Sequence, residues 1–416
     1  MNRDIIGAWF RKITVFLLCA TIFIVPFSIS FVEIFFWSTL TAWAISRILS
    51  RPKELFPLSL QPVKTKLNLP IFIFVLVAFL SVINSDHIQV SLKGFIIKLF
   101  KWVMVYFIIV EAVNDKKRFN RIVTVILFST TLVVINGLIQ SIRGSDLIGQ
   151  YSRMGVRISS SFNNPNGLGG WLIIMIPLTF ALAYFGTENW QKLLRAKDWI
   201  GIAKKVVFYV LTLFFIITLV STYSRGAWIA TFLSLIFLGV FKDRKFLIAV
   251  IAIFMFLSFA APHSVKLRAA SLINFEEMKD SKRIILWKEA LSIIKEYPVL
   301  GCGFNTYAVV GPSYRITESS GFYPHNSYLQ MAAELGIFGL GVFLWLIYRL
   351  FAISLANIKK IKDRFGSAML IGLLAGLFGF LAHSLVDTNI YAFRLSMLMW
   401  FTMGLIIAAQ RIFLEA

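Results

Sequence analysis

The sequence predicts an all-α polytopic membrane protein with about twelve transmembrane helices. Hydrophobic residues make up 58% of the 416 residues and charged residues only 15%, and the mean hydropathy is +0.79, which is too apolar for a soluble domain. Apolar runs of a length that can cross roughly 30 Å of hydrocarbon recur along the chain. They lie at about 13–31, 34–49, 68–84, 95–113, 120–142, 166–186, 205–221, 226–241, 245–262, 327–352, 366–385 and 394–413.

The basic residues predict the orientation of these helices. Dense groups of Lys and Arg occupy alternate connections, and the positive-inside rule assigns such connections to the cytoplasm. These groups lie within 47–66, 116–121, 192–205, 242–245 and 359–364. Both termini are then cytoplasmic. These basic loops, which can contact anionic membrane lipids, explain the formal charge of +22. The charge therefore gives no reason to expect a nucleic-acid partner.

The predicted organisation has three parts. Residues 1–262 form the first nine helices, residues 263–326 form a long outer loop, and residues 327–416 form the last three helices. Eight arginines fall on the outer side against the positive-inside rule, which indicates an anionic partner there. They are Arg143, Arg153, Arg157, Arg225, Arg268, Arg283, Arg315 and Arg394.

The long outer loop contains a predicted amphipathic helix over 281–295. Its apolar stripe consists of Ile284, Trp287, Leu291 and Ile294, and Ser281 is its candidate cap. We expect this helix to lie across the outer mouth of the bundle.

Two lysines interrupt the apolar run at 95–113. Lys98 and Lys101 are three residues apart and therefore share one helical face. We expect them either to extend to the outer interface or to contact a lipid phosphate.

His325 is the candidate catalytic residue. It precedes a predicted membrane helix on which Asn326, Gln330 and Glu334 recur every four residues, so that one helical face is polar and should line the protein interior or a wet cavity. An imidazole is well suited to proton transfer near neutral pH. The alternative is a histidine that only caps the helix or meets lipid.

Three arginines are candidate anion ligands, because a guanidinium binds phosphate through two parallel hydrogen bonds. Arg225 lies between two apolar spans, and the alternative for it is a cation satisfied by backbone carbonyls at a helix end. Arg283 begins the amphipathic helix, where it could instead be a solvated charge. Arg157 precedes Asn163-Asn164-Pro165-Asn166, a segment that could serve only to cap the next helix.

His383 and Asp387 form a second polar pair, one turn apart at the outer end of a helix. Asp387 could orient a basic partner or assist proton transfer. Pairing with an outer cation such as Arg394 is an equal alternative. Cys19 and Cys302 have no metal-ligand or disulfide spacing, so neither cysteine is assigned a role; that no metal and no other cofactor is needed is an expectation that comes with the resemblance described next.

Taken together, these fragments resemble the O-antigen ligase and polymerase family of bacterial envelope glycosyltransferases. The resemblance covers about residues 150–390 and follows the order of the fragments along the chain. The matching pieces are Arg157 with Phe162-Asn163-Asn164-Pro165-Asn166; Ser224-Arg225-Gly226-Ala227; Arg283 with Trp287, Ala290, Pro298, Gly301 and Gly303; His325-Asn326 with Leu329, Glu334 and Gly336; and His383 with Asp387.

The resemblance implies a GT-C type enzyme of the bacterial inner membrane whose site faces the periplasm. Its donor would be a glycan on undecaprenyl pyrophosphate, and its acceptor a sugar hydroxyl of the lipid A core. Arg225, Arg283 and Arg157 would hold the pyrophosphate, and His325 would activate or orient the hydroxyl. Asn326, Asp387, His383 and Glu334 would support the site. A single displacement would be metal-independent and would invert the anomeric carbon.

Two other functions compete with the ligase. A polymerase differs mainly in its acceptor, and we favour the ligase because His325 closes one long outer loop and no second large one is present. A lipid-linked glycan transporter or flippase could also have twelve spans. Transporters usually show repeated halves and ionisable groups near the midplane, whereas this sequence has no visible repeat and places its unusual charges at the outer surface.

Overall fold

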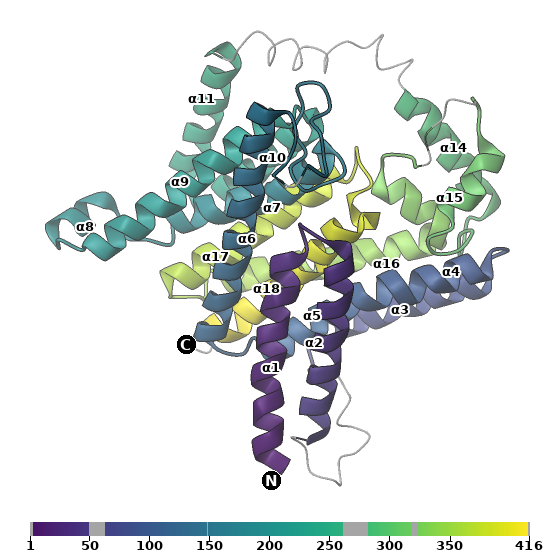
Figure 1. Cartoon of the computed structure of the whole chain (residues 1–416), viewed down its shortest axis with the longest axis horizontal. Helices are drawn as coiled ribbons and strands as arrows, with labels where there is room; N and C mark the ends of the chain where they lie inside the picture. Colours follow the sequence, from purple (N-terminus) through teal and green to yellow (C-terminus); the bar gives the residue numbers. More distant parts are fainter. Residues whose placement is uncertain are drawn as a thin grey trace.

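The computed structural model describes residues 3–49, 63–147, 149–260, 282–317, 321 and 323–414. Within these ranges the protein is all-helical apart from two isolated bridges in the 144–164 connection (Figure 1). The elements are α1 (Arg3–Ile24), α2 (Ile29–Leu49), α3 (Asn68–Ile83), α4 (Ile88–Gly94), η3 (Phe95–Leu99), α5 (Phe100–Ala112), α6 (Lys116–Arg143), α7 (Pro165–Tyr184), α8 (Trp190–Arg195), α9 (Trp199–Ser221), α10 (Arg225–Lys242), α11 (Arg244–Ala260), α14 (Lys282–Glu296), α15 (Tyr307–Val310), η4 (Gly311–Tyr314), α16 (Ser327–Ile358), α17 (Arg364–His383), η5 (Asn389–Tyr391) and α18 (Phe393–Leu414).

The helical membrane architecture is confirmed, and the predicted apolar runs fall largely on helix within the described residues, although the run at 13–31 crosses the turn between α1 and α2. Nine helices of the described ranges are long and apolar enough to cross a membrane: α1, α2, α6, α7, α9, α10, α16, α17 and α18. Among the other runs, α3 has 16 residues and α11 has 17. The run at 95–113 belongs to a longer continuous helix formed by α4, η3 and α5, which contains Lys93, Lys98 and Lys101. Twelve spans therefore remain a prediction.

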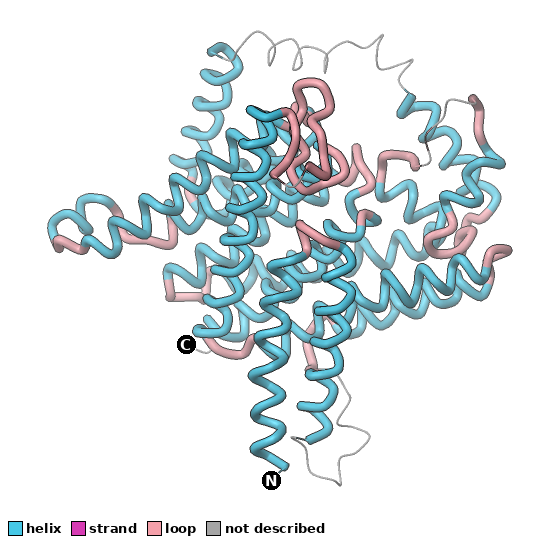
Figure 2. Tube along the Cα trace, in the orientation of Figure 1, coloured by secondary structure: helices cyan, strands magenta, loops and turns pink. Residues whose placement is uncertain are grey.

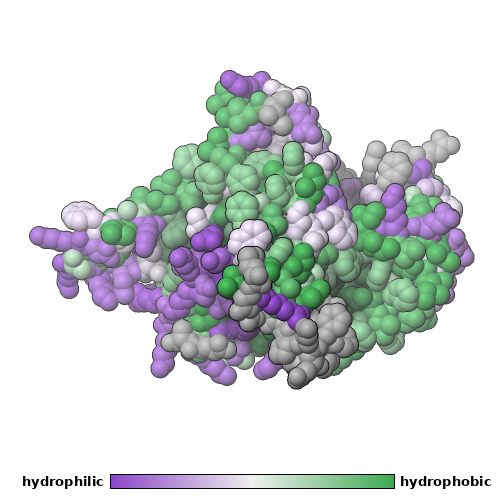
Figure 3. All heavy atoms as spheres, turned by 60° about the horizontal axis from the view of Figure 1, so that its bottom comes forward, coloured by the Kyte–Doolittle hydropathy of each residue, from purple (hydrophilic) through white to green (hydrophobic). Residues whose placement is uncertain are grey.

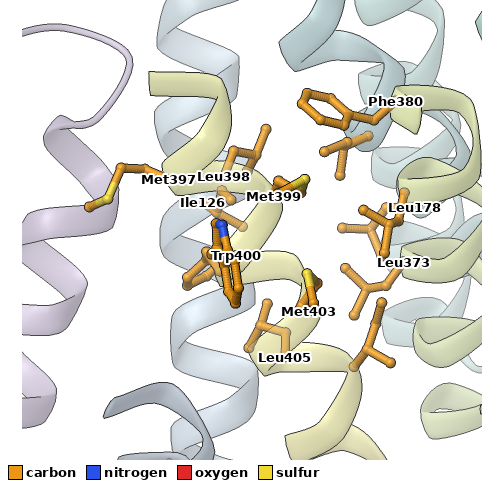
Figure 4. Packing of buried hydrophobic residues seen from close by; sticks show 14 of the residues in the cluster. Ile126, Leu178, Leu373, Phe380, Met397, Leu398, Met399, Trp400, Met403 and Leu405 are labelled. Atoms are coloured by element: carbon orange, nitrogen blue, oxygen red, sulfur yellow. The ribbon is translucent and has the colours of Figure 1, made fainter. Parts of the chain in front are cut away.

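The core is centred on α7, α17 and α18, whose residues are mostly buried. Figure 4 shows Leu178 of α7 beside Leu373 of α17, with Met403 of α18 in the same cluster. Small residues allow the backbones of α7 and α17 to approach closely: a Cβ atom added to Gly376 would lie 2.6 Å from the carbonyl oxygen of Ile174. Such contacts supply the van der Waals packing that associates helices in lipid.

Arg394 joins the N-terminal helices to this core. Its buried guanidinium donates to the carbonyl oxygens of Pro26 (3.1 Å) and Phe27 (3.4 Å) in the α1–α2 turn and to that of Ser161 (2.5 Å). The suggested pairing of Arg394 with Asp387 is therefore wrong, because both Nη atoms of the guanidinium donate to backbone carbonyls instead.

Lys98 and Lys101 of the α4–η3–α5 helix have protein partners, which neither of the two expected roles, extension to the interface or contact with a lipid phosphate, included. Lys101 is buried and forms an ion pair with Glu33 of α2. Lys98 Nζ donates to Asn305 Oδ1 at 2.5 Å. Both ammonium groups thus tie this helix to other parts of the protein, since burying a charge in a membrane protein requires a partner.

The amphipathic helix of the outer loop is present as α14, but its buried stripe differs from the predicted one. Leu286, Ala290 and Ile293 are buried, whereas Leu291 is 47% exposed. Ala290 and Ile293 pack in one cluster with Ala333 of α16. The small Ala290 side chain permits α14 to approach α16 closely. The face that α14 buries is therefore centred on Ala290 and not on the larger apolar residues of the predicted stripe. The candidate cap Ser281, like Arg268, lies outside the described residues.

A backbone kink in α16 receives the chain that follows α14. Gly336 has φ +71°, outside helical values, and the N–H of Ile337 donates to Pro298 O at 2.9 Å instead of to its own helix. A Cβ atom at Gly336 would lie 1.9 Å from Val299 O. Only glycine meets both the positive φ and the close backbone approach.

Candidate functional site

The site begins where the chain enters α16. His325 adopts φ +46°, a conformation that is rare for a residue with a side chain and that is found often at functional positions. Asn326 caps the helix, because its Oδ1 accepts the N–H groups of Tyr328 (3.0 Å) and Leu329 (3.1 Å). The cap ends the extended loop abruptly and leaves the His325 side chain 45% exposed at the helix entrance.

Ser327 attaches this entrance to the end of α17. Its N–H donates to the carbonyl oxygens of Ser384 (2.8 Å) and Asp387 (3.2 Å), and its hydroxyl donates to the same Asp387 carbonyl at 2.9 Å. The connection after α17 is therefore held against the start of α16. The Asp387 side chain consequently lies beside His325, although 62 positions separate the two residues.

A chain of hydrogen bonds runs from His325 to Arg157. His325 Nδ1 lies 3.4 Å from Asp387 Oδ1, at the long end of hydrogen-bond distances. Asn166 Nδ2 donates to Asp387 Oδ2 at 2.7 Å, and Asn166 Oδ1 accepts from the Arg157 guanidinium at 2.9 Å. The Nε of Arg157 donates to Thr222 O at 2.9 Å. The chain thus joins the starts of α7 and α16 to the connection after α17.

Asp387 is the anion of this network. Burial by itself would raise the pKa of Asp387, but the hydrogen bond with His325, the proximity of His383 and the N–H of Thr388 outweigh burial and lower the pKa to about 2. Asp387 is therefore ionised throughout the physiological pH range. A carboxylate beside Nδ1 orients an imidazole and favours the tautomer that carries its proton on Nδ1.

Arg225 is the first residue of α10 and lies near His383. A Cβ atom added to the adjacent Gly226 would lie 2.9 Å from a methyl group of Val386 and 3.1 Å from the His383 ring. His383 is buried, and its Nδ1 lies 2.6 Å from the side-chain amide of Asn389. The start of α10 thus packs directly on the end of α17, close to the segment that carries Asp387.

Arg283 approaches the same region from the outer loop. It is an exposed residue in the first turn of α14, and its charge lies within electrostatic range of the His383 imidazole. Arg225 and Arg283 thus lie in the neighbourhood of His383 and come from two different elements, α10 and α14. Arg157 is connected to Asp387 through Asn166.

Glu334 belongs to a different part of the structure. It is fully buried, and its carboxylate accepts the N–H groups of Asn305 (2.6 Å) and Tyr307 (3.2 Å) as well as the side-chain amide of Gln330 (3.0 Å). The polar face predicted for α16 does face the protein interior. Glu334 holds the end of the outer loop to that face and makes no contact with His325 that the structure describes.

The comparison with protein families covers the middle of this site. The family model of O-antigen ligases matches residues 208–344. This region carries the O-antigen ligase family signature. The predicted resemblance is thereby confirmed. The matched O-antigen ligase region contains Arg225, Arg283 and His325, whereas Arg157, His383 and Asp387 lie outside it. A comparison with curated proteins found no match.

The match to O-antigen ligases over residues 208–344 and the apolar helices of the described residues together support a multi-pass membrane protein similar to ligases and polymerases of O-antigen biosynthesis. In general terms, the O-antigen ligase family implies a lipid-linked glycan donor and a lipid acceptor. The individual donor, acceptor and site residues are treated as proposals below.

Sequence reasoning gave no site role to Asn166 and Ser327. Asn166 lies in a segment whose amides are typical of helix caps, and Asn164 does cap α7 by accepting the N–H of Gly167 at 2.8 Å. The amide two positions later in the same motif bonds across the site instead. The sequence did contain a signal for Asn166. Asn164 already caps the helix before Pro165, so the additional Asn after the proline was available for another role. Ser327 had no comparable signal, because its partners are backbone carbonyls.

Proposed function

We propose that the protein is an O-antigen ligase that transfers a glycan from undecaprenyl pyrophosphate to a sugar hydroxyl of the lipid A core. The reaction would take place at the periplasmic face of the bacterial inner membrane, within a GT-C type architecture. The observation that carries the proposal is the hydrogen-bonded chain His325–Asp387–Asn166–Arg157 in a chain whose residues 208–344 match O-antigen ligases.

His325 is the proposed catalytic base. An imidazole that donates from Nδ1 to Asp387 has its lone pair on Nε2, which can take the proton of an acceptor hydroxyl. The ionised Asp387 stabilises the imidazolium that forms. The hydroxyl oxygen then bonds to the anomeric carbon, the bond from that carbon to the phosphate oxygen breaks, and the electron pair leaves with the pyrophosphate.

The arginines are proposed to stabilise the leaving group. Negative charge develops on the departing pyrophosphate, so guanidinium groups placed there bind the transition state more strongly than the ground state. Arg225 and Arg283 come from α10 and α14, and Arg157 is held in place by Thr222 and Asn166. A single displacement of this kind inverts the anomeric carbon, and no step requires a metal ion or another cofactor.

Transfer by purified protein in detergent, from a lipid-linked glycan to lipid A core, tests the proposal. We expect His325→Ala to lower the transfer rate about 10²–10⁴-fold, the usual contribution of a positioned base. His87→Ala, which removes an exposed imidazole at the start of α4, is the matched control and should retain the parent rate. Full transfer by His325→Ala would refute the catalytic role.

The acceptor and the stereochemistry are tested in the same assay. Lipid A core should accept the glycan, whereas preferential extension of a second lipid-linked glycan would identify the alternative, an O-antigen polymerase. Nuclear magnetic resonance of the product should show an inverted anomeric configuration, and a retained configuration would contradict a single displacement. Movement of the intact donor across vesicles without transfer would instead indicate the more distant alternative, a flippase.

A further inference from the structure

The first turn of α10 carries main-chain donors that no side chain caps. Ser224 precedes the helix, and its side chain makes no capping hydrogen bond. The N–H groups of Gly226 and Ala227 likewise donate to no acceptor among the described residues. The first N–H groups of a helix have no partner inside it, and the peptide dipoles place partial positive charge at this end. The start of α10 is therefore suited to hold an anion.

The ring of His383 lies on this turn. His383 ends α17 and is only 2% exposed. A Cβ atom added to Gly226 would lie 3.1 Å from Cδ2 and 3.2 Å from Nε2 of the ring. Because Gly226 has no side chain, nothing from that position covers the Nε2 edge. The imidazole thus turns its Nε2 edge toward the uncapped start of α10.

One hydrogen bond fixes the tautomer of His383. Its Nδ1 lies 2.6 Å from the side-chain amide nitrogen of Asn389. An amide nitrogen donates and does not accept, so Nδ1 is the acceptor and carries no proton. The imidazole is then neutral, with its one proton on Nε2. No described residue bonds to Nε2, and a buried donor of this kind requires a partner, because leaving it unsatisfied is costly.

The charges around the ring favour an anion as that partner. Arg225 is the first residue of α10, and the charge of Arg283 lies within electrostatic range of His383. Asp387 lies within the same range, but its carboxylate is already engaged by His325 (3.4 Å) and Asn166 (2.7 Å). Two guanidinium groups, a helix N-terminus and a neutral donor therefore adjoin one another.

We propose that the Nε2–H of His383 and the N–H groups of Gly226 and Ala227 form an anion hole for the pyrophosphate of the glycan donor. This inference rests on the proposed function and gives His383 a direct contact with the donor instead of a supporting role. The guanidinium groups neutralise the pyrophosphate, whereas the three uncharged donors fix the positions of its oxygens.

The anion hole would act on the bond that breaks. When the acceptor oxygen bonds to the anomeric carbon, the electron pair of the bond between that carbon and the phosphate oxygen stays on the oxygen. Donors that already point at the departing charge stabilise it without having to reorganise. A neutral His383 also keeps its proton during this step, so it does not compete with His325 for the proton of the acceptor hydroxyl.

Two substitutions of His383 separate this contact from a purely structural role. An Asn side chain places its amide near the position of Nδ1, and a Gln side chain places its amide near that of Nε2. His383→Asn therefore keeps an acceptor for Asn389 and removes the Nε2 donor, whereas His383→Gln keeps a donor near Nε2 and removes the Nδ1 acceptor. Gly226→Ala retains the imidazole and sets a methyl group against its Nε2 edge.

Binding of undecaprenyl pyrophosphate without a glycan, measured by native mass spectrometry of the purified full chain, tests the inference without the transfer reaction. Undecaprenol, which has no phosphate, is the second ligand. The control variant is Arg195→Gln, which neutralises an exposed cation at the end of α8. Figure 3 shows hydrophilic surface on the side where α8 lies in Figure 1, so this variant reports the attraction of an anion by surface charge alone.

His383→Asn and Gly226→Ala should bind undecaprenyl pyrophosphate roughly ten- to hundredfold more weakly than the parent, as expected for losing a hydrogen bond to a charged group. His383→Gln and Arg195→Gln should bind it nearly as tightly as the parent. All of these proteins should bind undecaprenol equally, because the anion hole acts on phosphate oxygens.

Parent-like affinity of either His383→Asn or Gly226→Ala for undecaprenyl pyrophosphate would overturn the inference. Weaker binding by His383→Gln alone would also overturn it, since only the contact with Asn389 would then matter. An equal loss in Arg195→Gln would show a diffuse surface effect instead of a site. Failure of the parent itself to bind undecaprenyl pyrophosphate would contradict the proposed donor, and with it the proposed function.

Discussion

At the scale of single residues, the position of His325 depends on contacts made by its neighbours. Asn326 caps α16 and Ser327 ties that cap to the segment after α17, so the backbone at His325 is held in a left-handed conformation. This arrangement fixes the imidazole beside a carboxylate before any substrate binds. Preorganisation of this kind lowers the cost of reaching a reactive geometry.

Asn166 should act as a positioning residue. It holds Asp387 Oδ2 and Arg157 at once, so Asn166→Ala should lower kcat by about 10²-fold, the cost of a displacement of about 1 Å. Asn166→Asp should be slower still, because two carboxylates would then repel each other.

The exposed Asn163, which accepts from Tyr151 Oη at 3.0 Å, provides the control Asn163→Ala. Steady-state transfer kinetics and thermal unfolding of the three variants would separate positioning from folding: equal kcat values in Asn166→Ala and Asn163→Ala would refute the role.

The ionisation of Asp387 predicts an effect of pH on stability. Its pKa in the folded protein, about 2, is below the usual value of about 3.9, so the ionised carboxylate adds stability above pH 4, and this stability is lost as the pH falls toward 2. Asp387→Asn should remove this acid dependence.

Thermal unfolding of the parent and of Asp387→Asn between pH 2 and 7 checks this effect. Melting temperatures that fall in parallel for the two proteins below pH 4 would show that Asp387 does not supply the acid dependence.

At the scale of elements, the outer loop is anchored to α16 at a helical kink. Gly301 and Gly336 both have positive φ and both lie against the backbone of the other segment. Glu334 adds two hydrogen bonds to the loop backbone in the same region. The loop that carries Arg283 and leads to His325 is thereby fixed at its middle.

Gly336→Ala should destabilise the protein by about 2 kcal/mol or more, because the added methyl group meets a carbonyl oxygen and the positive φ disfavours any side chain. Gly341→Ala on the same helix is the control: a Cβ atom there meets nothing within 4 Å, so the change should be neutral or stabilising by about 0.5–1 kcal/mol. Thermal unfolding in detergent measures both. Equal melting temperatures for the two variants would contradict the proposed role of the kink.

At the scale of the whole molecule, the helical core carries the site where α16 begins and α17 ends, and the turn between α16 and α17 lies at the other end of these two helices. Figure 2 shows that the 144–164 connection, which joins α6 to α7, lies at one end of the bundle, away from the turn between α16 and α17. This separation agrees with the orientation predicted from the basic loops, which assigns the α16–α17 turn to the cytoplasm and the 144–164 connection to the periplasm.

Labelling of single cysteines tests that orientation. Met154 in the 144–164 connection is 51% exposed, so Met154→Cys should react with a membrane-impermeant maleimide when only the outer membrane is permeable. Lys360→Cys at the opposite end should react only after the inner membrane is opened. The parent is a suitable background, because both native cysteines are buried and burial raises the pKa of the Cys302 thiol to about 12. The reverse pattern would contradict the proposed topology.

The sequence alone determined the helical membrane class, the position of the helices and the resemblance to O-antigen ligases. These properties follow from apolar length, from charge asymmetry and from short motifs, all of which are local. It also identified His325, Arg225, Arg283 and Asp387 as candidates, since charged residues are costly near lipid and therefore conspicuous.

Only the tertiary structure decided which of these residues meet. Asp387 bonds to His325 and Asn166 instead of Arg394, Glu334 secures the outer loop, and Lys101 pairs with Glu33. The face that α14 buries is likewise determined by the packing of Ala290 against α16. Such choices depend on the packing of helices that are distant in sequence, and on the buried hydrogen bonds that this packing permits, so no local pattern could specify them.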